Sequence, residues 1–220
     1  MIASVGEIVV TGSGAELRVT GTGPDAVVCV NGGGRAEVPG TWSTTVEWLV
    51  EQLAPRFPGL RFGEVRYRVK SWRRIDLCVE DALGAIAALE PERTLMLGFS
   101  MGGSVSVRVA AEPSVTGILA LAPWLPEQLD LSPLDGKRLA IVHGSLDSPL
   151  PGIPGVTASS SRRAYARAVA LGIDASYSVI RGGLHGAAVR GPWGRPVALP
   201  RAGAWLAAVA DELQRFEGSR

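Results

Sequence analysis

Short apolar runs alternate with longer stretches of helical periodicity along this chain, and that alternation constrains its fold more than any other feature. The apolar runs predict strands at 26–30, 61–69, 94–99, 114–123, 138–144 and 175–180. The first of these, AVVCV, is continuous and β-branched, as expected of a strand covered on both faces. Such alternation predicts an α/β fold, in which helices cover both faces of a mostly parallel sheet.

The segments between the strands carry helix signals. Helices are predicted at 44–53, at 76–89, from close to Met101 onward, at 159–171, and at the C-terminus around Trp205, Val209, Leu213 and Phe216. Asp76 is the predicted N-cap of the second helix, because its carboxylate can accept from free amides of the first turn. At the N-terminus, 7–11 and 16–20 flank a Gly-Ser-Gly turn and predict an antiparallel hairpin at the sheet edge.

The length of 220 residues suits a single domain spanning 1–220. Residues 124–137 connect two predicted strands and are too few to build a lid domain, and the Pro/Gly-rich stretch around 152–155 predicts a loop. Cys29 and Cys78 lie in apolar segments, which favours buried, reduced thiols over a disulfide between them.

Composition excludes several function classes. Apolar content of 46% and a net charge of +1, without a lysine- or arginine-rich run, argue against nucleic acid or an acidic membrane as partner. Arg66, Arg68 and Lys70 alternate along a strand end, which favours a solvated face; the alternative is that one of them meets an anionic substrate. The sequence shows neither a basic leader before an apolar block nor a membrane-spanning run, so a cytoplasmic location is expected. A monomer or homodimer is the expected oligomeric state.

A serine stands between two glycines in Gly98-Phe99-Ser100-Met101-Gly102, at a predicted junction of strand and helix. In that setting G-x-S-x-G forces a tight, strained turn and exposes the hydroxyl above the sheet, and Gly103 lets the helix pack closely. The pentapeptide alone is common, so the prediction of a nucleophile at Ser100 depends on the partners that the rest of the chain supplies.

Two histidines are candidates for the base that a serine nucleophile requires. His185 lies in a glycine-rich loop after the last predicted strand and is favoured; His143 closes a strand, where packing or a backbone hydrogen bond is the usual role. Asp147, just past a strand end in HGSLD, is the predicted carboxylate that orients the base. Its competitors suit ordinary surface positions: Asp130, Asp135 and Asp174.

The oxyanion of a tetrahedral intermediate needs preorganised amide donors. The predicted donors are the backbone N–H of Met101, which follows the nucleophile, and that of Gly33, in the glycine run that follows the strand at 26–30. A plain flexible turn is the alternative for Gly32-Gly33-Gly34. Predicted pocket walls are Trp124, Leu146 and Trp193, each of which suits ordinary packing equally well.

Together these segments resemble the small, lidless α/β-hydrolases of the bacterial serine esterase and dienelactone-hydrolase-like type. The resemblance covers nearly the whole chain through NGGG at 31–34, GFSMGG at 98–103, ALAPWLP, HGSLD and GLHG. It implies acyl transfer to water through an acyl-serine, with no metal or organic cofactor. Many members have histidine where Asn31 and Phe99 stand; neither is a triad position, so the departures concern pocket shape and the oxyanion loop.

The expected function is hydrolysis of a small carboxylic ester, lactone or thioester. Two alternatives remain: the same triad used for C–C hydrolysis, perhydrolysis or acyl transfer, and a non-catalytic binding protein of the same fold. Phosphate-loop and dinucleotide fingerprints are missing from the sequence, and two widely separated histidines argue against a catalytic zinc site.

Overall fold

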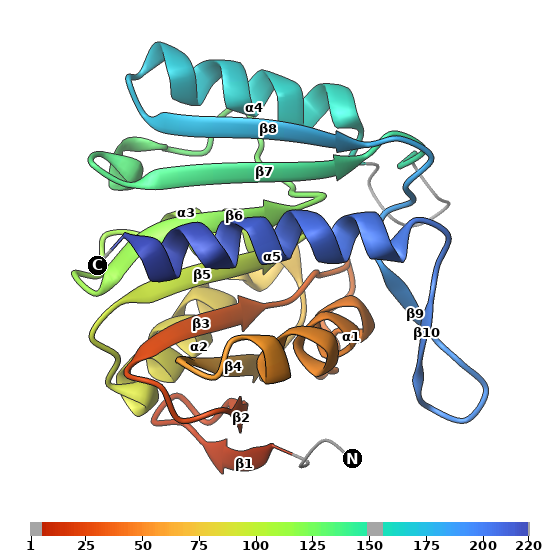
Figure 1. Cartoon of the computed structure of the whole chain (residues 1–220). Coiled ribbons are helices and arrows are strands. Elements are labelled where there is room, and N and C mark those ends of the chain that lie inside the picture. The colour runs from red at the N-terminus through yellow and green to blue at the C-terminus, as the bar shows by residue number, and fades with distance from the viewer. Residues whose placement is uncertain (1–5, 149–155, 220) are drawn as a thin grey trace.

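The computed structural model describes residues 6–148 and 156–219, which build an eight-stranded sheet in the order β1-β2-β4-β3-β5-β6-β7-β8 (Figure 1). The strands are β1 Glu7–Val10, β2 Glu16–Thr20, β3 Asp25–Val30, β4 Leu60–Arg66, β5 Thr94–Phe99, β6 Val115–Leu121, β7 Arg138–Gly144 and β8 Asp174–Ile180. The neighbouring strands β4, β3, β5, β6, β7 and β8 are all parallel. By contrast, β1 pairs with β2, and β2 with β4, in antiparallel register. The predicted mostly parallel sheet with an N-terminal hairpin is therefore confirmed.

Helices cover both faces of this sheet (Figure 1). They are α1 Thr44–Leu53, α2 Ile75–Leu89, α3 Gly102–Val109, α4 Ala158–Ala170 and α5 Ala202–Gly218. Buried side chains of α2, α3 and α4 form one apolar cluster with the sheet, and those of α1 and α5 form the other. Since β3 lies between these clusters, all six of its residues are buried, which explains the unbroken apolar run at 26–30.

Local signals explain the helix that most closely matches its prediction. The hydroxyl of Ser43 caps α1 by accepting the Val46 N–H, and Val46, Leu49, Val50 and Leu53 recur at helical spacing on its buried face. The helix continues into a short 3-10 turn, Ala54–Arg56, in which Pro55 removes a backbone donor.

The N-cap prediction at Asp76 is wrong. The 3-10 turn Trp72–Arg74, itself capped by the Ser71 hydroxyl, runs directly into α2, so the helix begins at Ile75 with Arg74 at its cap position. Asp76 lies one residue inside the first turn, where its negative charge still favours the helix dipole.

A second hairpin was not predicted. The strands β9 Ala188–Arg190 and β10 Pro196–Ala198 pair outside the main sheet, and each has only three residues, too short for a periodic signal (Figure 1). Between β6 and β7 the chain forms only the 3-10 turn Ser132–Leu134, so no lid domain is inserted there, as predicted. The predicted loop at 152–155 lies outside the described residues.

Both cysteines are buried and unpaired, which confirms the reduced thiols. Burial raises the pKa of Cys78 to about 12 and that of Cys29 well above its ordinary value, so neither sulfur is a ready nucleophile. Within 6–148 and 156–219, no helix combines the length and apolar character that crossing a bilayer requires.

Candidate active site

Ser100 occupies the tight turn between β5 and α3 with a left-handed φ of 55°. A non-glycine residue in this region costs about 1–3 kcal/mol, so the surrounding structure must impose it. Three backbone hydrogen bonds do so: the Ser100 N–H donates to the Leu121 carbonyl at 2.9 Å, and its carbonyl accepts from Gly103 and Trp124 at 3.0 and 2.8 Å. The strained serine is thus held between α3 and the end of β6.

Two glycines make room for this turn. A Cβ on Gly98 would lie 2.5 Å from the Gly102 carbonyl oxygen and 2.6 Å from Ser106 Oγ, and one on Gly102 would lie 2.5 Å from the Val30 carbonyl oxygen. Because most of these obstacles are backbone atoms of packed elements, neither site has space for a side chain.

Replacing Gly98 with alanine is expected to lower the free energy of unfolding by about 1–3 kcal/mol, because the new methyl overpacks the strand against α3. Urea denaturation measures the change. Gly203→Ala is the matched control: a Cβ there meets no atom within 4 Å and lies in α5, so stability should stay equal or rise. Equal stability of the Gly98 variant and the wild type would contradict the packing argument.

The loops after β7 and β8 bring Asp147 and His185 together. His185 Nδ1 lies 2.7 Å from Asp147 Oδ2, so the carboxylate accepts the Nδ1–H and leaves Nε2 as the proton acceptor of the neutral ring. Gly144 allows the loops to approach, because a Cβ there would lie 2.5 Å from the Gly183 carbonyl oxygen. The Leu146 N–H then donates to that same carbonyl at 2.9 Å.

Asp147 stays ionised although its side chain is only 4% exposed. Burial raises its pKa, but hydrogen bonds and attraction from His143 and His185 outweigh burial, so the pKa of Asp147 lies below its ordinary value. With the folded-state pKa lowered, the stability that this carboxylate contributes is present above its unfolded pKa and is lost as the pH falls through the folded one. At neutral pH the site therefore contains a carboxylate.

His185 lies over the turn that carries Ser100. The ring of Phe99 packs 5.0 Å from the His185 ring, and a Cβ on Gly186 would lie 3.3 Å from the same phenyl ring. Among the described residues, Ser100 Oγ makes no hydrogen bond to His185 Nε2. Catalytic hydrogen bonds of this kind are often long in unliganded enzymes and tighten when substrate binds.

The loop after β3 packs against the serine turn. A Cβ on Gly32 would lie 3.2 Å from Ser100 Cβ, and one on Gly33 would overlap the Met101 sulfur. Asn31 fixes this loop: its Oδ1 accepts the Gly32 N–H and its Nδ2 donates to the Thr41 carbonyl, both at 2.7 Å. In the described part of the chain, no acceptor takes the backbone amides of Gly33 and Met101.

A cavity of about 620 Å³ opens beside His185. Its walls include Asn31, Trp42, Lys70, Phe99, Leu146 and His185. Of the predicted wall residues, Leu146 lines this cavity, Trp124 packs its side chain against the apolar core, and Trp193 is 91% exposed in the β9–β10 turn.

Sequence reasoning missed Trp42 and included Lys70 only within a group of basic residues, one of which was the alternative candidate for contact with an anionic substrate. Trp42 follows β3 and Lys70 follows β4. Because the carboxyl ends of parallel strands gather at one edge of the sheet, the position of these residues after predicted strands could have indicated that they lie near the site. The Lys70 ammonium donates to Thr41 Oγ1 at 3.1 Å, and no described carboxylate lies within 4.0 Å of it. Burial lowers the pKa of Lys70.

Comparison with known proteins gives structural likeness only. No protein-family model matches the sequence, and no curated protein matches it. Among solved structures, the chain is similar to an esterase (EaEST) from Exiguobacterium antarcticum, with a TM-score of 0.63, 14% identity, and coverage of 95% of this chain and 99% of that one.

Two further structures have the same TM-score of 0.63. A dienelactone hydrolase from Anabaena variabilis is 16% identical, with 94% of each chain covered. A variant of the meta-cleavage product hydrolase CumD from Pseudomonas fluorescens IP01 is 14% identical, with 96% of this chain and 98% of that one covered. The sheet order, the left-handed serine turn and these likenesses show that the chain has the α/β-hydrolase fold, without a lid domain between β6 and β7.

Proposed function

We propose that this protein is a serine hydrolase that cleaves a small carboxylic ester, lactone or thioester through an acyl-serine intermediate. The observation that carries the proposal is the strained Ser100 turn beneath a histidine whose Nδ1 is already held by a buried carboxylate. In a site without catalytic function, nothing would offset the energetic cost of a left-handed serine beside an oriented histidine.

In the proposed reaction, His185 Nε2 takes the proton of Ser100 Oγ as the oxygen attacks the acyl carbon. The carbonyl oxygen becomes an oxyanion, which the amides of Met101 and Gly33 stabilise. The imidazolium, stabilised by Asp147, then protonates the leaving alcohol or thiol. Water repeats the sequence on the acyl-serine, releases the acid and restores the hydroxyl.

The position of Gly33 beside Met101 supports these two amides as the donors, since Asn31 already occupies the amide of Gly32. The open cavity supports a small substrate. A panel of p-nitrophenyl esters and thioesters tests this preference: short acyl chains should give the higher kcat/KM, and a clear advantage for long chains would overturn it.

The second candidate is another reaction of the same triad, such as C–C hydrolysis, because a meta-cleavage product hydrolase is among the structural neighbours. A protein that reacts covalently at Ser100 but turns over no ester or thioester would favour this candidate. The expectations of a monomer or homodimer and of a cytoplasmic location remain predictions.

We further propose that the substrate carries a negative charge, because Lys70 is the cavity cation without a carboxylate partner among the described residues. Lys70→Met is expected to lower kcat/KM about tenfold or more for p-nitrophenyl hemiglutarate, through loss of a charge-assisted hydrogen bond. The neutral p-nitrophenyl valerate should be unaffected.

Arg108→Met serves as the control for this substitution. It removes the same charge from an exposed position on α3 and should leave both rates unchanged. An equal loss for the charged and the neutral ester in Lys70→Met would contradict an anion-binding role.

A further inference from the structure

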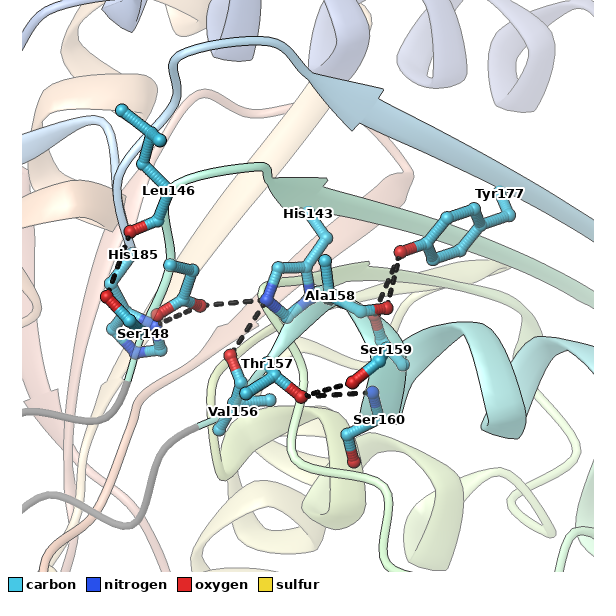
Figure 2. Close-up of polar contacts among 12 residues, drawn as sticks. His143, Leu146, Ser148, Val156, Thr157, Ala158, Ser159, Ser160, Tyr177 and His185 are labelled. Atoms are coloured by element: carbon cyan, nitrogen blue, oxygen red, sulfur yellow. Dashed lines mark hydrogen bonds and ion pairs between the residues drawn. The ribbon is translucent and has the colours of Figure 1, made fainter.

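His143 is a fully buried histidine that the proposed reaction does not use. It stands near the end of β7, where sequence reasoning favoured packing or a backbone hydrogen bond. The structure shows the backbone bond, from Nε2 to the Val156 carbonyl at 3.0 Å, and adds one that was not predicted: Nε2 lies 2.8 Å from Asp147 Oδ2. Figure 2 shows the His143 ring between His185 on one side and Tyr177 on the other.

The partners of His143 determine where its proton lies. The Val156 carbonyl and the Asp147 carboxylate can only accept, so Nε2 must carry the hydrogen and share it between them. Nδ1 then accepts in the neutral ring, and the Ser161 hydroxyl, 2.8 Å away, can donate to it. The Ser161 hydroxyl also lies 3.2 Å from the Ala158 carbonyl and 3.3 Å from the Tyr177 hydroxyl. Because Tyr177 itself donates to that carbonyl at 2.7 Å, Nδ1 is the nearest acceptor left for the Ser161 hydrogen.

One carboxylate oxygen thus serves two imidazoles. Asp147 Oδ2 accepts from His143 Nε2 at 2.8 Å and from His185 Nδ1 at 2.7 Å. The ring of His143 is fully enclosed, whereas the side chain of His185 is 28% exposed. The enclosed ring of His143 is therefore held in place, whereas the ring of His185 is the one that a substrate can reach.

We propose that His143 is a positioning residue of this active site, whose Nε2–H holds the Asp147 carboxylate at the angle at which it also receives the His185 Nδ1–H. The inference rests on the proposed serine hydrolase function. It assigns to His143 no contact with substrate and no part in proton transfer. Without that hydrogen bond the carboxylate can rotate, and His185 loses its fixed orientation toward Ser100.

The electrostatics of Asp147 agree with this geometry. The hydrogen bond from His143 is the largest of the effects that lower the pKa of the carboxyl group. Its loss should raise that pKa and make the carboxylate a stronger partner for the imidazolium of His185. The acid limb of the kcat profile should therefore move to higher pH, which simple destabilisation of the fold would not cause.

Three variants test the proposal. Glutamine at 143 can present an amide N–H near the position of Nε2, whereas asparagine is too short to reach Asp147, so His143→Gln and His143→Asn form a matched polar pair. Tyr177→Phe removes the hydrogen bond to the Ala158 carbonyl but leaves the Ser161 hydroxyl in place to donate to His143, so it controls for local destabilisation. Rates are expressed per reactive serine, titrated with a fluorophosphonate, so that a misfolded fraction does not count.

His143→Asn is expected to lower kcat about 10- to 100-fold, the cost of a slightly misplaced catalytic group, with little change in KM and with the shifted acid limb. His143→Gln should recover most of the rate, and Tyr177→Phe should match the wild type. Equal kcat and equal acid limbs in the Asn and Gln variants would overturn the positioning role.

A second measurement needs no substrate. The His185 Nδ1–H bound to Asp147 should give a far-downfield proton resonance in the NMR spectrum, which His143→Asn should shift or broaden and His143→Gln should preserve. An unchanged resonance in both variants counts against the inference even in a protein without esterase activity. Absence of ester turnover with an altered resonance would instead refute the proposed function alone.

Discussion

Replacing Ser100 with alanine is expected to lower kcat for a short-chain p-nitrophenyl ester by at least about 10³-fold, with the fold intact. The substitution removes the proposed nucleophile and leaves the turn, because the backbone bonds to Leu121, Gly103 and Trp124 do not involve the hydroxyl. Initial rates measure the loss, and a urea midpoint close to that of the wild type shows that folding is preserved.

Ser106→Ala is a close control for this change. Ser106 lies on α3, and its buried hydroxyl has no hydrogen-bond partner in the described structure, so its removal should cost neither activity nor stability. Retention of more than a tenth of the wild-type kcat by the Ser100 variant would mean that another group performs the chemistry.

Asp147→Asn is expected to lower kcat about 10³- to 10⁴-fold at neutral pH, as seen when a triad aspartate becomes an amide. Oδ2 faces N–H donors of both His143 and His185, and a neutral amide is a weaker acceptor there or turns its NH₂ toward His185 and selects the wrong tautomer. It also lacks the charge that stabilises the imidazolium. Steady-state rates between mildly acidic and neutral pH measure the effect.

Asp130→Asn is the control for the proposed triad acid, because Asp130 is one of the competing carboxylates in the sequence. The Asp130 carboxylate only accepts from the amide and hydroxyl of Ser132 in an exposed turn, so its loss should leave kcat unchanged. Comparable losses in the two variants, or none in Asp147→Asn, would remove Asp147 from the proposed mechanism.

Sequence reasoning succeeded where the deciding physics is local. The strand 138–144 and the helix 44–53 were predicted with the bounds that the structure has, since an unbroken apolar run, a serine cap and helical spacing all act over a few residues. The serine turn belongs to the same class, because the two glycines that flank the left-handed Ser100 leave no room for a methyl and are visible in the local sequence.

Prediction from the sequence failed where the local pattern is too short or ambiguous, and where tertiary packing decides. Asp76 lost the cap position because a preceding 3-10 turn joins the helix, and the three-residue strands of β9 and β10 have no periodicity to detect. The bond between His143 and Asp147 spans four residues, yet it depends on α4 closing over the ring and on the histidine pointing toward the acid. Neither the position of α4 nor the direction of the histidine side chain can be predicted from the residues HGSLD alone.

Peptide mapping by mass spectrometry after treatment with a fluorophosphonate tests whether Ser100 is a nucleophile activated by His185. We expect one phosphonyl group per chain, located on Ser100, that forms more slowly as acid converts His185 to an imidazolium unable to accept the serine proton. A phosphonyl group on another residue, or none at neutral pH on the folded protein, would contradict this expectation.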